Sequence, residues 1–95
     1  MEKADKHTVE MRPDEYATLL RNPMVMSACD ALLAAPRRRG GYVILRLTEG
    51  QLEDLTGWVA AEANHAKTKQ EEDALGEVCD NLESVLSGVK MGRNR

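Results

Sequence analysis

TEGQLEDLTGWVAAEANHAKTKQEEDALGEVCDNLESVLSG, residues 48 to 88, decides the fold because it contains two helix-start signals twenty residues apart. In TEGQ at 48–51 and TKQE at 68–71, the threonine oxygen can accept a hydrogen bond from the backbone amide three residues later. The Gln or Glu at that position can reach back to the threonine amide. Such capping boxes satisfy donors that the start of a helix leaves open. With Gly88 as a helix-ending residue, the stretch predicts an antiparallel helical hairpin over about 49–66 and 69–87.

Each helix of this hairpin carries an apolar stripe with the period of an α-helix. The first stripe consists of Leu52, Leu55, Val59, Ala63 and Ala66, and the second of Leu75, Val78, Cys79, Leu82, Val85, Leu86 and Val89. Burying one Leu or Val side chain is worth roughly 1.5–3 kcal/mol. We therefore expect the two stripes to face each other and to supply much of the stability, so that Leu82→Asp breaks the hairpin.

Upstream of the hairpin, the pattern predicts one good strand and two short helices. Residues 42–47 alternate, which places Val43, Leu45 and Leu47 on one face. One strand cannot satisfy its own backbone groups, so we expect it to pair either with a weaker strand at 7–12, as a two-stranded ribbon, or with its copy in a second subunit. Prolines at 13 and 23 open helices over about 14–21 and 23–34.

The expected fold is therefore α+β and predominantly helical, built as a single small domain over residues 1–95. Residues 1–6 and 90–95 are charged and are expected to be flexible tails. The segment RRRGG at 37–41 is expected to be a flexible, basic connection. A chain of this length buries only about 60–65% of its unfolded surface, and this one has no Phe, so we expect a homodimer to supplement a thin core.

Cofactors, metals and catalysis are not indicated by the sequence. The first twelve residues lack an apolar signal-peptide core, and the longest nearly apolar stretch, 23–36, is too short to cross a membrane. His7, His65, Cys29 and Cys79 do not form the close ligand pairs of zinc sites; His65 suits the negative end of the first hairpin helix. We therefore expect a cytoplasmic, non-enzymatic protein without a cofactor or a membrane contact.

Three apolar residues are the candidates for an interaction surface. Met24 and Met26 lie on a helix that is apolar almost all round, and it is either packed centrally under the hairpin or exposed as a docking face. Trp58 lies off the main stripe of its helix, where it either covers the N-terminal helices or serves as an interface hot spot. The function expected first is a small protein–protein interaction or assembly module.

The alternative function is nucleic-acid binding. From Tyr42 onward, the order strand, helix, turn, helix resembles the ribbon-helix-helix class, in which paired strands of a dimer enter a DNA groove. The resemblance covers about half the chain without a specific motif, and it implies phosphate contacts from Arg37, Arg38, Arg39 and Arg46. The charge disfavours it: the whole chain carries −3, and residues 42–95 hold six basic against ten acidic side chains. The outward strand face also offers only Tyr42, Ile44 and Arg46.

Overall fold

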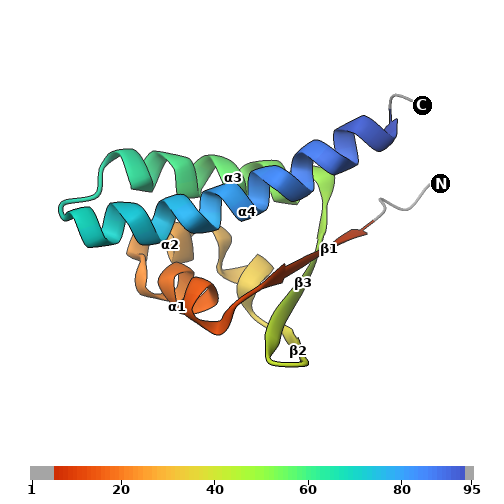
Figure 1. The fold of residues 1–95 in the computed structure, drawn as a ribbon, viewed down its shortest axis with the longest axis horizontal. Coiled ribbons are helices and arrows are strands. Elements are labelled where there is room, and N and C mark those ends of the chain that lie inside the picture. Colours follow the sequence, from red (N-terminus) through yellow and green to blue (C-terminus); the bar gives the residue numbers. More distant parts are fainter. Residues whose placement is uncertain (1–5, 94–95) are drawn as a thin grey trace.

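A computed structural model describes residues 6–93 of the chain and confirms the α+β, predominantly helical fold. The four helices in this range lie to one side of a small antiparallel sheet, and the two longest run alongside each other (Figure 1). In chain order the elements are β1 (Lys6–Met11), α1 (Pro13–Arg21), α2 (Pro23–Leu33), β2 (Arg37–Arg39), β3 (Tyr42–Thr48), α3 (Glu49–Asn64) and α4 (Lys69–Arg93).

The helical hairpin starts where the capping signals predict. At the start of α3, Thr48 Oγ1 accepts from the Gln51 amide at 3.1 Å, and Gln51 Oε1 accepts from the Thr48 amide at 2.9 Å. At the start of α4, Thr68 Oγ1 accepts from the Glu71 amide at 3.1 Å, which is the threonine half of the second box. These bonds supply partners for amides that the first helical turn leaves open.

The predicted end of the hairpin at Gly88 is wrong, because α4 continues to Arg93. Val85 and Leu86 are partly buried against the core, and Lys90 Nζ lies 3.2 Å from Glu53 Oε2 of α3. These contacts offset the cost of a glycine in a helix interior, which is about 1 kcal/mol. Residues 90–93 are therefore helical and not a tail, and Lys6 belongs to β1; the rest of the two predicted tails lies outside the described residues.

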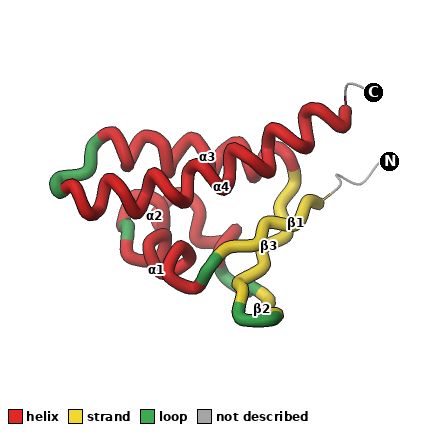
Figure 2. The backbone as a smooth tube through the Cα atoms, viewed as in Figure 1, coloured by secondary structure: helices red, strands yellow, loops and turns green. Residues whose placement is uncertain are grey.

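The sheet, drawn in yellow in Figure 2, has three strands in the order β1-β3-β2, and not the two that the sequence predicts. The pairing of 7–12 with 42–47 is confirmed within the chain, with Val9 opposite Leu45. The third strand is the segment expected to be a flexible connection. Gly40 and Gly41 have φ of +57° and +84°, the two positive values that a tight two-residue hairpin needs, and they fold Arg37–Arg39 back onto β3.

The edges of this sheet are poor sites for a further strand. The central strand β3 is paired on both sides, so the intersubunit ribbon of the ribbon-helix-helix arrangement is excluded for it. Along β1, Asn81 of α4 donates from Nδ2 to the Glu10 carbonyl at 2.9 Å. The other edge, β2, is only three residues long and follows Pro36. Short, charged or covered edges discourage strand addition, which leaves the face of the sheet as its accessible surface.

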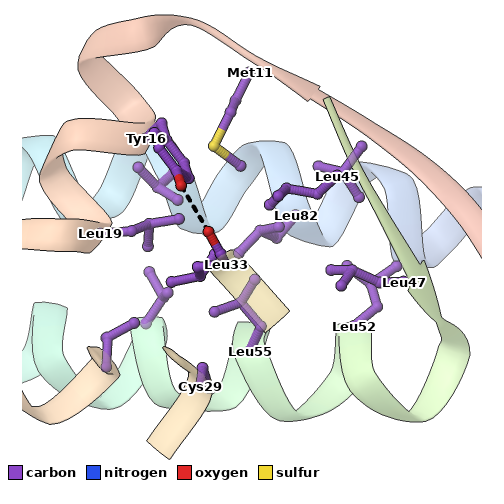
Figure 3. Close-up of a cluster of buried hydrophobic side chains, with 14 of the residues drawn as sticks. Met11, Tyr16, Leu19, Cys29, Leu33, Leu45, Leu47, Leu52, Leu55 and Leu82 are labelled. Carbon is purple, nitrogen blue, oxygen red and sulfur yellow. Dashed lines mark hydrogen bonds between the residues drawn. The ribbon is translucent and has the colours of Figure 1, made fainter. Parts of the chain in front are cut away.

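The core lies between the sheet and the helices. Figure 3 shows Leu45 of β3, Leu55 of α3 and Leu82 of α4 pointing into the same interior. Tyr16 of α1 is buried there and donates its hydroxyl to the Leu33 carbonyl at 2.6 Å. The facing apolar stripes predicted for the hairpin thus form part of this core, since Leu52, Leu55, Val59, Leu75, Val78 and Leu82 are all fully buried.

Helix α2 is buried on one side and exposed on the other, so neither alternative from the sequence, a central buried helix or an exposed docking face, describes all of it. Val25, Cys29 and Leu33 are buried along one side, whereas Met24, Ala28 and Ala31 face solvent. The backbone at Cys29 leaves the helical region (φ −128°, ψ 17°), which kinks the helix in its interior. Cys29 and Cys79 are both free thiols in the core, and burial raises the pKa of each, that of Cys79 to about 11.

Candidate nucleic-acid interface

The side of the sheet that faces away from the helices, called the outer face here, is basic. Residues directly opposite each other in an antiparallel pair share a face, so Arg37 lies beside Ile44 and Arg39 beside Tyr42. The register of β1 adds Thr8 beside Arg46. Within residues 6–93, the outer face consists of Lys6, Thr8, Glu10, Arg37, Arg39, Tyr42, Ile44, Arg46 and Thr48, and its residues are exposed or half-buried.

The cations of the outer face are not neutralised by neighbouring acids. Within residues 6–93, no carboxylate oxygen lies within 4 Å of the guanidinium groups of Arg37, Arg39 or Arg46. Among the described residues of this face, four basic side chains and one carboxylate, that of Glu10, give a formal charge of +3, whereas the whole chain carries −3. The outer face is therefore locally positive although the chain as a whole is negative.

Arg12, by contrast, is an arginine with carboxylate partners. It lies 3.0 Å from Asp14 Oδ1 and 2.6 Å from Glu77 Oε1 of α4. The hydrogen bonds to Asp14 and Glu77 raise the pKa of Arg12, and the hydrogen bond from Arg12 lowers the pKa of Asp14. This pair joins the β1–α1 junction to α4 and is a structural contact, so it leaves no cation free for an outside partner.

Arg38 does not join the other three arginines predicted to contact phosphates. It lies opposite the fully buried Val43, hence on the helix side of the sheet. Its guanidinium carbon is 5.9 Å from the centre of the Tyr16 ring, within the range of a cation–π contact. The structure therefore brings together Arg37, Arg39 and Arg46 and assigns Arg38 to the support of α1.

Sequence reasoning missed how many residues surround Tyr42 and Ile44. The sequence pattern places both on the outward face of one strand but predicts a flexible connection at 37–41, so it does not place Arg37 and Arg39 beside them. The signal that could have found this arrangement is Gly40-Gly41 between a basic run and an alternating apolar run, which is typical of a β-hairpin.

The acidic side chains gather on the helical side of the molecule. In α4, Glu71, Glu72, Asp73, Asp80 and Glu83 are all exposed, and this helix belongs to the layer that covers the inner side of the sheet (Figure 1). Charges in aqueous salt are screened over about 8 Å at physiological ionic strength. With the core layer between the two sets of charges, the outer face acts on a partner mainly through its own arginines.

The three residues predicted for a protein interface differ in their exposure. Met24 is 48% exposed, while Met26, two positions further along the helix, is partly buried against the core. Trp58 is 38% exposed on α3, beside a shallow hollow lined by Glu53, Asp54, Gly57 and Ala61.

A side-chain hydrogen bond joins α2 to α3. Asn22 Nδ2 donates to Glu62 Oε1 at 3.2 Å and fixes the start of α2 against the end of α3.

Other chemistry is sparsely represented in the described part of the chain. Residues 6–93 contain no group of three or more His, Cys, Asp and Glu side chains placed to hold a metal, and none of their helices is long and apolar enough to span a bilayer. His65 Nδ1 lies 2.8 Å from the Ala61 carbonyl, at the end of α3 where the sequence predicts it. Comparisons with protein-family models, curated proteins and solved structures gave no match.

Proposed function

We propose that this protein is a small non-enzymatic module that binds nucleic acid through the outer face of its sheet. The observation that carries the proposal is that Arg37, Arg39 and Arg46 share with Tyr42 a face that no described helix covers. A guanidinium binds phosphate through two parallel hydrogen bonds and stays charged at every physiological pH. Because these arginines have no acidic partner within residues 6–93, binding a phosphate does not require breaking an ion pair.

The acidic net charge of the chain limits the affinity for nucleic acid but does not prevent phosphate contacts at the outer face. Three arginines give about three phosphate contacts. For a single strand, the logarithm of the binding constant falls with the logarithm of the salt concentration, with a slope of about −0.7 for each phosphate contacted. Three contacts therefore give a slope of about −2. Binding should therefore weaken roughly 15-fold between 50 and 200 mM salt.

The test is fluorescence anisotropy of a labelled twelve-nucleotide oligodeoxythymidine titrated with the full chain at several salt concentrations. Arg37→Ala, Arg39→Ala and Arg46→Ala should each weaken binding and reduce the salt slope by about 0.7. Arg21→Ala is the matched control, because Arg21 is an exposed arginine at the end of α1, away from the sheet. Absence of binding at 50 mM salt, or an equal loss with Arg21→Ala, would refute the proposal.

A second candidate function, association with a second copy of the chain, is favoured by the solvent side of α2. Met24 and Ala28 are exposed one helical turn apart, and Ala31 is exposed beyond the kink at Cys29; small side chains at these positions allow a second helix to approach closely. Light scattering should then show a dimer at micromolar concentration that Met24→Lys converts to a monomer. A wild-type protein that stays monomeric under these conditions contradicts this candidate and leaves the sheet-face proposal unaffected.

A further inference from the structure

We infer that the outer face binds single-stranded rather than double-stranded nucleic acid, with Tyr42 as the stacking platform for a base; this inference rests on the proposed function. The aromatic residues of the described chain differ sharply in their surroundings. Tyr16 is buried, with its hydroxyl bonded to the Leu33 carbonyl and Arg38 over its ring. Trp58 is 38% exposed on α3, beside the acidic residues Glu53 and Asp54. Tyr42 is 47% exposed among the free arginines.

The arginines are placed to hold the backbone of a strand that has one base stacked on Tyr42, since Arg39 lies across from Tyr42 and both Arg37 and Arg46 lie on the side of it away from the hairpin tip. Arg39 lies directly across from Tyr42, about 5 Å away in the direction of strand pairing. Arg37 is two residues from Arg39 on the same face of β2, about 7 Å from Arg39. Arg46 is four residues along β3 from Tyr42, about 13 Å from it. This spacing suits a short run of nucleotides that crosses the sheet with one base on the ring.

The shape of the face does not suit a duplex. Base readout in the major groove of a duplex uses a helix or a two-stranded ribbon, whereas every described helix lies on the inner side of the sheet (Figure 1). The tip of the β2–β3 hairpin is Gly40-Gly41, which has no side chain to reach a base edge. Duplex bases are already stacked on one another, while single-stranded bases are free to stack on an aromatic ring.

The test compares three labelled probes of twelve nucleotides: oligodeoxythymidine, an abasic oligomer with the same phosphates, and a duplex. Wild-type protein should bind oligodeoxythymidine at least 10-fold more tightly than the abasic oligomer, because stacking on an aromatic ring accounts for that order of affinity per base. Tyr42→Ala should lose about 10-fold on oligodeoxythymidine and be unchanged on the abasic oligomer and the duplex. Tyr42→Phe keeps the ring and should stay within about twofold of wild type.

The outcomes separate this inference from the proposal beneath it. If the duplex binds as tightly as oligodeoxythymidine, or if Tyr42→Ala has no effect while Arg39→Ala still weakens binding, single-strand recognition is wrong and nucleic-acid binding stands. If none of the probes binds, the proposed function itself fails. A twelve-residue glutamate peptide that binds as tightly as oligodeoxythymidine also overturns both, because the face then recognises acidic protein. The comparison of oligodeoxythymidine with the abasic oligomer uses wild-type protein and does not depend on the folding of any variant.

Discussion

Replacing Gly88 with alanine distinguishes the two roles that this residue can have in α4. If the helix ended there with glycine in the left-handed region, alanine would cost roughly 1–2 kcal/mol. In the structure, however, α4 continues through Gly88 to Arg93 with no positive φ at this position, and a Cβ added to Gly88 meets no atom within 4 Å. Gly88→Ala should therefore stabilise the protein by about 0.5–1 kcal/mol.

The assay is urea and thermal unfolding followed by circular dichroism, in which a change of 1 kcal/mol shifts the melting temperature of a domain this size by about 4–8 °C. Gly57→Ala is the positive control, because Gly57 lies inside α3 with equally open space around it, and it should also stabilise. Gly41→Ala should destabilise, because φ there is +84°. A Gly88→Ala variant that is less stable than wild type, while Gly57→Ala is more stable, would show that α4 ends at residue 88.

Three further predictions concern packing, pH and thiol chemistry. Leu82→Ala should lower the free energy of unfolding by about 2–5 kcal/mol in urea titrations, since Leu82 is fully buried, whereas Met91→Ala, at an exposed site of the same helix, should change it by less than about 0.5 kcal/mol. Arg12 lowers the pKa of Asp14 in the folded state, so the pair should stabilise the fold above the unfolded pKa of Asp14, about 3.9. This contribution is lost as the pH falls further. Asp14→Asn should therefore flatten this part of the pH profile of the urea midpoint, and an unchanged profile would contradict the pairing. Burial raises the pKa of Cys79 to about 11. In the Cys29→Ser variant, where Cys79 is the remaining thiol, Cys79 should react with a disulfide reagent at pH 8 much more slowly in folded protein than in urea-unfolded protein. Equal rates would show that the site opens freely.

The sequence by itself determined the features that depend on a few neighbouring residues. The threonine at 48 and the glutamine three positions later close a capping box wherever the chain then becomes helical, so the start of α3 is readable locally. The starts of α1 and α2 follow from prolines in the same way. The pairing of residues 7–12 with 42–47 was also among the predicted alternatives, because an alternating strand needs a partner.

Only the tertiary structure decided where α4 ends and which charges share a surface. A glycine in a helix costs about 1 kcal/mol, and whether the helix passes through it depends on contacts such as Lys90 with Glu53, which are distant in sequence. Likewise, three consecutive arginines give no hint that the outer two share a face with Tyr42 while Arg38, also exposed, lies on the other face against Tyr16. That division arises because pairing with β3 imposes a two-residue alternation on β2, and the pairing exists only once the hairpin at Gly40-Gly41 has closed.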